Sequence, residues 1–196
     1  DCLALLECID PTDRCPYCFS PDYNLANRTC PDCYKAKPVF ARVASVFDYA
    51  GPAGTLIKKI KYSDKAYLAE GAGAYLAMQF LQLEWPMPDL IIPVPITFTH
   101  WFSRGYNQSH LLAKGLSKIV QVPVQEALVR KSGDFSQAGL SHHQRLKLSG
   151  ETFFLKKNQE LRDKTLLLVD DVMTTGKTLG KCAEVLYEQC PSSIYA

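Results

Sequence analysis

The chain has 196 residues, of which 47% are hydrophobic and 21% charged, and its formal net charge is +2. This length and composition favour one α/β domain of ordinary size with a small appendage, and the charge balance excludes a global basic field that attracts nucleic acid. No apolar run approaches the length of a membrane span. The first residues, DCLALLECIDPTDRC, are acidic and unlike a secretion signal, so we expect a cytoplasmic protein.

Four cysteines near the N-terminus form two close pairs, Cys15 with Cys18 and Cys30 with Cys33. Two such pairs can converge as four thiolates on one tetrahedral Zn²⁺. Disulfides and a dithiol redox pair are the alternatives, but disulfides need an oxidising compartment and a redox motif would be single. We therefore predict a zinc-binding module over residues 1–38, in which the metal supplies folding energy that the few apolar residues cannot.

The other cysteines lack this spacing. Cys2 and Cys8 are interpreted as spare thiols rather than ligands. Cys182 and Cys190 are assigned to the last helix, where we expect them to pack against the core.

Beyond Pro38 the composition changes to aromatic and β-branched residues. The segment FARVASVFDYAG predicts one or two strands, and GPAG (residues 51–54) predicts a turn. TLIKKIKY then predicts a short helix, on which Lys58 and Lys61 either form a solvated face or reach a phosphate-rich ligand. A strong helix pattern follows over Asp64–Glu84, with Asp64 as the expected N-cap.

DLIIPVPI predicts a strand that is buried on both faces. The next residues, 97–105, are expected to be a loop with Arg104 near its end. Asn107 or Ser109 then begins an amphipathic helix. The later segment 132–148 shows no sustained periodicity and is interpreted as a functional lid. Its adjacent histidines, His142 and His143, face different ways, so we do not expect them to bind zinc.

The sequence TLLLVDDVMTTGKTL, residues 165–179, carries the most specific signal. Its apolar run predicts a buried strand, and helical spacing resumes from Leu179. The turn between them would lie outside the carboxyl end of the strand, where open α/β sheets bind ligands. Backbone N–H groups and threonine hydroxyls there suit a phosphate, whereas Asp170 and Asp171 suit sugar hydroxyls or Mg²⁺. Hydroxyls and a phosphate on one small molecule indicate a ribose phosphate.

This stretch resembles the phosphoribosyl-pyrophosphate (PRPP) motif of type I phosphoribosyltransferases. The resemblance implies that Asp170 and Asp171 contact the ribose hydroxyls and that the loop after them holds the 5′-phosphate. The loop residues carried over are Thr174, Thr175, Gly176, Lys177 and Thr178. The side chain of Lys177 either neutralises phosphate or points to solvent. A strand and turn without a ligand is disfavoured, because paired buried acids are costly to keep.

Four signatures in order narrow the resemblance: the cysteine pairs, PVP…RGYNQ, SQAGLS…R…G.TF and LLLVDDVMTTGKTL. Together they are similar to the ComF family (ComFC, also called GntX-like) over nearly the whole chain. This implies a type I phosphoribosyltransferase-like parallel sheet flanked by helices over residues 39–196, behind the small four-cysteine zinc module. One departure is Lys147, which stands where the family usually has Asn. SSIYA, at the end of the sequence, predicts a last strand.

The resemblance implies a role in natural competence, where DNA enters as a single strand through the inner membrane. We expect PRPP or another ribose phosphate as ligand, with Mg²⁺ at the pyrophosphate end and the Arg104 loop around it. Single-stranded DNA and a competence helicase such as ComFA are the expected partners, and peripheral contact with the inner membrane stays open. The alternative is an active phosphoribosyltransferase that acts on an unidentified acceptor.

A DNA-binding face is predicted at Lys58, Lys61, Arg104 and Tyr106. This prediction rests on the resemblance together with this clustering of basic and aromatic residues. Further aromatic rings either stack on bases or belong to the core; these are Tyr17, Tyr23, Trp101 and Phe102.

Overall fold

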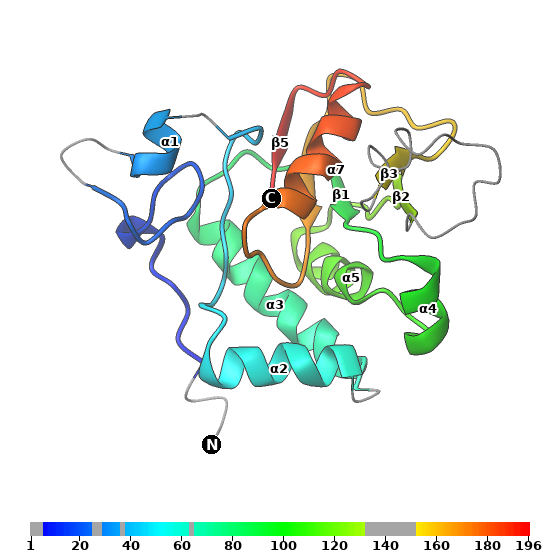
Figure 1. The fold of residues 1–196 in the computed structure, drawn as a ribbon, viewed down its shortest axis with the longest axis horizontal. Coiled ribbons are helices and arrows are strands. Elements are labelled where there is room, and N and C mark those ends of the chain that lie inside the picture. The colour runs from blue at the N-terminus through cyan, green and yellow to red at the C-terminus, as the bar shows by residue number, and fades with distance from the viewer. Residues whose placement is uncertain (1–5, 25–28, 36–37, 63–64, 132–151) are drawn as a thin grey trace, which may run out of the picture.

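The computed structural model describes residues 6–24, 29–35, 38–62, 65–131 and 152–196 (Figure 1). Its centre is a parallel sheet of three strands in the order β1–β4–β5. The strands are β1 (Leu90–Pro93), β4 (Thr165–Val169) and β5 (Ser193–Tyr195). The buried strands expected from DLIIPVPI and TLLLV are therefore confirmed, as is the last strand in SSIYA.

Alternate residues of the central strands enter two different cores. Leu166 and Leu168 pack with the buried face of α7 (Lys177–Tyr187). Leu167 and Val169 pack with helices on the opposite face. Because both faces of the sheet are covered, every residue of β4 after Thr165 is apolar. The result is a sheet between two helical layers.

The remaining elements surround this sheet in the order of the chain. A short 3₁₀ helix, η2, and five α-helices besides α7 are described. They are η2 (Pro11–Asp13), α1 (Pro31–Lys35), α2 (Gly51–Tyr62), α3 (Tyr67–Gln82), α4 (Phe98–Arg104) and α5 (Gln108–Val120). The strands β2 (Leu128–Lys131) and β3 (Thr152–Leu155) form a separate antiparallel pair. This pair was not expected from the sequence.

Helices α3 and α5 cross at two glycines. A Cβ built on Gly73 would lie 2.7 Å from both the Cα of Gly115 and the carbonyl oxygen of Leu112. A Cβ on Gly115 would lie 2.7 Å from the carbonyl oxygen of Glu70. Real Cβ atoms do not approach backbone so closely, so the distance between these two helices depends on having no side chain at either position.

Three local expectations were wrong. The segment 40–50 contains no strand element; residues 41–44 hydrogen-bond to residues 194–196 with one isolated bridge from Arg42 to Tyr195, and the chain then bends. Residues 51–54 are the first turn of α2, a position where Pro52 costs no hydrogen bond. Residues 98–104 form α4 rather than a loop, since Thr97 caps its start and Gly105 ends it with φ of +77°.

Helix boundaries moved by a few residues elsewhere. Helix α7 begins at Lys177, inside the predicted turn, and α3 begins at Tyr67 after Ala66, which makes no side-chain cap. Cys182 is a buried residue of α7, as expected, but Cys190 is exposed and follows the end of the helix with φ of +51°. The expected cap Asp64, the spare thiol Cys2 and the segment 132–148 with His142, His143, Arg145 and Lys147 lie outside the described residues.

Candidate functional site

The turn from β4 to α7 lies at the carboxyl end of the central strand. Asp170 and Asp171 follow directly after β4, and Gly176 is the N-cap of α7 with φ of +68°, a left-handed conformation that favours glycine. A Cβ added to Gly176 would meet nothing within 4 Å, so the space before the helix start is open. The first N–H groups of a helix lack partners within it, and here they face a place where an anion can approach.

The two carboxylates of the pair have different partners. Oδ1 of Asp170 accepts from Ser109 Oγ at 2.9 Å and from the backbone N–H of Asp171 at 2.9 Å. Oδ2 of Asp171 lies 2.7 Å from Nζ of Lys61, and the two side chains are only 5% and 20% exposed. One carboxylate is thus oriented by hydrogen bonds and the other by a cation.

Burial, and after it the negative charge of Asp171, raises the pKa of Asp170 to about 6. The two hydrogen bonds to Asp170 and the ammonium of Lys61 act in the opposite direction. Near neutral pH the carboxylate is ionised but close to its titration, so its charge costs the free protein stability. Such a carboxylate gains from any ligand that donates hydrogen bonds to it.

The Arg104 region lies beside this turn. Asn107 donates from Nδ2 to the carbonyl oxygen of Val94 at 3.0 Å, and it caps α5 by accepting from the N–H of Ser109. Arg104 donates to Gln108 Oε1 at 3.1 Å, and its guanidinium lies 5.1 Å from the centre of the Tyr62 ring. The cap at Asn107, one of the two helix starts considered from the sequence, therefore holds the start of α5 against the end of β1.

The last residues of α2 contact the site from the other side. The carbonyl oxygen of Ile60 accepts a hydrogen bond from the Tyr106 hydroxyl, Lys61 pairs with Asp171, and Tyr62 lies under Arg104. The expected DNA-binding face thus changes in composition, because Lys61 is directed to the acid pair and Tyr106 is bonded to the main chain. Lys58 alone of the two lysines is exposed.

Helix α4 presents three exposed aromatic rings. Phe98, Trp101 and Phe102 are 65%, 50% and 78% exposed. The rings of Phe98 and Trp101 are stacked with centroids 6.2 Å apart. The core alternative considered for Trp101 and Phe102 is therefore wrong, and Phe98 was not among the aromatic residues considered.

A cavity of about 860 Å³ opens beside the same turn. Residues 170–176 line one part of it, and Cys18, Phe19 and Cys33 line another. Its walls are mostly apolar and come from α2, α3 and the segment 38–49. Small-molecule sites are commonly apolar cavities of this size with a few polar groups at one end.

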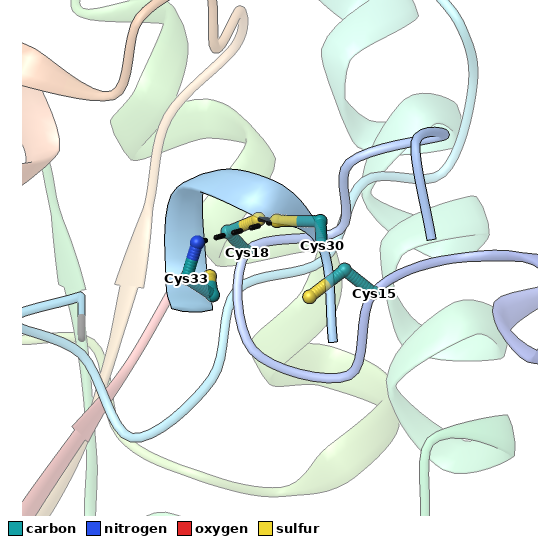
Figure 2. Close-up of side chains that lie close together, drawn as sticks. All are labelled: Cys15, Cys18, Cys30 and Cys33. Atoms are coloured by element: carbon teal, nitrogen blue, oxygen red, sulfur yellow. Dashed lines mark hydrogen bonds between the residues drawn. The ribbon is translucent and has the colours of Figure 1, made fainter. Parts of the chain in front are cut away.

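The four N-terminal cysteines meet as the spacing predicts. One possible ligand atom from each of Cys15, Cys18, Cys30 and Cys33 lies within 4.8 Å of every other (Figure 2). Sγ of Cys18 is 3.4 Å from Sγ of Cys30, and Sγ of Cys30 accepts from the N–H of Cys33. Tetrahedral coordination with a Zn–S distance of about 2.3 Å requires sulfur atoms roughly 3.8 Å apart. The donor set and its spacing fit a metal such as zinc.

The thiols of this cluster differ in acidity. Burial raises the pKa of Cys15, but N–H groups of Cys18, Tyr17 and Cys30 outweigh burial and lower it to about 7. Burial raises the pKa of Cys18 to about 11 and that of Cys33 further. Cys15 therefore ionises readily and can begin metal capture, while Cys18 and Cys33 ionise with the metal's help.

Comparisons with known proteins agree with this description. Residues 107–196 match the family model of the phosphoribosyl transferase domain. The DNA utilization protein YhgH of Escherichia coli O157:H7 is 31% identical over 182 residues, which cover 89% of this chain and 79% of that protein. Competence protein F of Haemophilus influenzae is 29% identical over 179 residues, 87% of this chain and 78% of that protein. ComFC of Bacillus subtilis is 25% identical over 181 residues, which cover 89% of this chain and 72% of that protein.

The sheet, its flanking helices and the matched domain define a phosphoribosyltransferase-type fold. The chain belongs to the ComF family, together with YhgH, competence protein F and ComFC. Among solved structures, a purine phosphoribosyltransferase from Pyrococcus horikoshii has 21% identity and a TM-score of 0.41, over 66% of this chain and 70% of that one. Likeness at that level does not identify a substrate.

Sequence reasoning missed how two residues join the acid pair. Ser109 was considered only as a helix start, and Lys61 as part of a solvated face or as a contact to a phosphate-rich ligand or to DNA. Both lie far along the chain from Asp170 and Asp171, so no local pattern joins them to the acid pair. A faint signal exists for Ser109, because it lies in the first turn of a helix that starts at the carboxyl edge of the sheet.

Proposed function

We propose that this protein binds PRPP, with Mg²⁺ at its pyrophosphate end, through the turn from β4 to α7. The observation that carries the proposal is the acid pair, Asp170 and Asp171, beside an open helix start at Gly176. The carboxylates accept from the ribose hydroxyls, and the N–H groups and the hydroxyls of Thr174, Thr175 and Thr178 surround the 5′-phosphate. Mg²⁺ offsets the charge of the pyrophosphate, close to Arg104.

Calorimetry with PRPP and Mg²⁺ tests this site directly. Asp171→Asn keeps the shape of the side chain but removes a charged acceptor, which costs roughly 1.5–3 kcal/mol, or about 10- to 150-fold in affinity. Glu188→Gln, which changes an exposed acid beyond the end of α7, should leave the affinity unchanged. Absence of binding by the wild-type protein would contradict the proposal.

We further propose that the protein serves the handling of incoming single-stranded DNA in natural competence, beside a helicase such as ComFA. Its support is the kinship with proteins named for competence and DNA utilization. The exposed aromatic rings of α4 give bases a surface on which to stack. Among the helices of the described ranges, none combines the length and apolar character that crossing a bilayer requires.

An active phosphoribosyltransferase is the second candidate. The cavity of about 860 Å³ favours it, because the space adjoins residues 170–176 and an acceptor needs room beside the ribose. Isotope exchange between pyrophosphate and PRPP, measured with and without candidate acceptors, distinguishes the two functions. Exchange that requires an acceptor indicates transfer chemistry, whereas binding without exchange indicates a sensing or regulatory site.

A further inference from the structure

The ion pair between Lys61 and Asp171 joins the acid pair to the end of α2. The Asp171 side chain is 5% exposed and Nζ of Lys61 lies 2.7 Å from its Oδ2. Yet Oδ2 is a buried oxygen that receives no hydrogen bond from the described residues, because the geometry at the ammonium is poor for one. The ion pair neutralises the charge of Asp171 but gives Oδ2 no hydrogen bond. A buried acceptor without a hydrogen bond lowers the stability of the protein.

A ribose hydroxyl can provide what this oxygen lacks. It is a neutral donor that can align with the carboxylate, and the proposed ligand carries two such groups. The ammonium of Lys61 occupies the position that such a donor needs, so the two compete for Oδ2. The ammonium of Lys61 can move away from Oδ2, since it is carried at the end of a flexible four-carbon stem.

Once displaced, the Lys61 ammonium needs another anion, because its side chain is only 20% exposed. Its neighbour Tyr62 lies under Arg104, the residue proposed for the pyrophosphate end. In the proposed binding mode, the displaced Lys61 and Arg104 would both face the pyrophosphate, the most negative part of the ligand. A ribose phosphate without the pyrophosphate offers the displaced lysine no such partner.

We propose that Lys61 is a movable counter-ion that selects ligands with an anionic group on ribose C1. It neutralises Asp171 in the free protein and passes to the pyrophosphate when the ribose hydroxyls take Asp171. Lys61 is thereby a specificity-determining residue, and the site favours PRPP over ribose 5-phosphate. The inference rests on the proposed PRPP site and deepens it.

The test compares two ligands on the same variants by calorimetry, each with Mg²⁺. In Lys61→Gln, affinity for PRPP should fall about 10- to 150-fold, because a charge-assisted contact to the ligand is lost. Affinity for ribose 5-phosphate should stay within about threefold or improve, since no ion pair has to break. Lys59→Gln removes the same charge from an exposed position on the same helix and should leave both affinities unchanged.

Each outcome of this test either supports or overturns the inference about Lys61. If Lys61→Gln weakens both ligands equally, Lys61 only maintains the shape of the site and the inference is overturned alone. If the wild-type protein binds neither ligand, the proposed function fails and the inference fails with it. Should Lys61→Gln not fold, Lys61→Gln/Asp171→Asn removes both buried charges together. Compared with Asp171→Asn, that variant should again lose affinity for PRPP selectively; an unchanged ratio of the two affinities overturns the inference.

Discussion

Asp170, in the proposed ligand site, carries a charge that lowers the stability of the free protein. It is buried, it lies beside a second carboxylate, and only part of this burden is relieved by Ser109 and the N–H of Asp171. Aspartate is a demanding choice there, since a neutral residue of the same shape could accept the same two hydrogen bonds at Oδ1. That tension is expected at a position kept for a ligand.

Asp170→Asn should therefore stabilise the free protein at neutral pH. The folded-state pKa of about 6 lies above the ordinary value of 3.8, so the carboxylate destabilises the fold as pH rises through 6, and this cost disappears below about pH 4. The cost builds up between about pH 4 and pH 6 and is constant above, so the expected gain at pH 7.5 is on the order of 1–3 kcal/mol and shrinks from pH 6 toward pH 4. Thermal unfolding at both pH values measures it. Equal stability of the two proteins at pH 7.5 would contradict the assigned cause.

Among the elements, the three strands of the parallel sheet and the helices with apolar periodicity could be predicted from the sequence. The apolar run Leu166–Val169 and the cap at Asn107 are local signals, and both appear as expected. The acids after β4 were found for the same reason, because a strand end and a glycine-containing turn are neighbours in the chain. The site's partners were not, since Lys61 and Ser109 reach Asp171 and Asp170 only through the packing of α2 and α5.

Other elements depend on information that a short window does not contain. The pair β2–β3 places Lys131 opposite Thr152 across a long separation in the chain, and its burial pattern does not alternate cleanly. Helix α4 is polar or aromatic throughout and has no buried residue, so no apolar periodicity marks it. Only its caps at Thr97 and Gly105 define it, and caps without a periodic segment between them are a weak signal.

The crossing of α3 and α5 gives an element-scale prediction. Gly73→Ala should destabilise the protein by about 1–3 kcal/mol, because the added methyl group would meet the backbone of α5. Gly71→Ala, at an exposed position of the same helix with nothing within 4 Å, should be neutral or gain up to about 1 kcal/mol from helix propensity. Denaturant unfolding of the pair checks this. Equal effects of the two substitutions would mean that the crossing is adaptable.

The cysteine cluster gives a second prediction at this scale. The purified protein should carry about one Zn²⁺ per chain, and Cys30→Ser should abolish it and destabilise residues 6–35. Cys190→Ser, at an exposed thiol outside the cluster, should retain the metal. Acidification should release zinc, since protons compete for the thiolates. Elemental analysis together with hydrogen exchange of the segment measures both effects, and a metal-free folded protein would rule the site out.

At the scale of the whole molecule, the net charge is only +2, so DNA binding has to come from local groups of side chains. We predict weak binding of single-stranded DNA that falls steeply with salt, because phosphate contacts release counterions. Phe102→Ala on α4 should cost roughly 1–3 kcal/mol of stacking. Tyr34→Ala, an equally exposed aromatic on α1, is the control. Fluorescence titration at two salt concentrations measures this, and an unchanged affinity in Phe102→Ala would remove α4 from the DNA surface.

The contact between Gly73 and Gly115 has a consequence for how this family can diverge. Helix α5 begins at the residues that hold Asp170 and the end of β1, so its position cannot shift without moving them. A single substitution at Gly73 or Gly115 would therefore be poorly tolerated even if the other glycine is kept. We expect both positions of the helix crossing to change rarely among relatives. A relative that no longer bound the proposed ligand would be released from that demand. Larger residues at positions 73 and 115 would then mark lineages in which the site no longer functions.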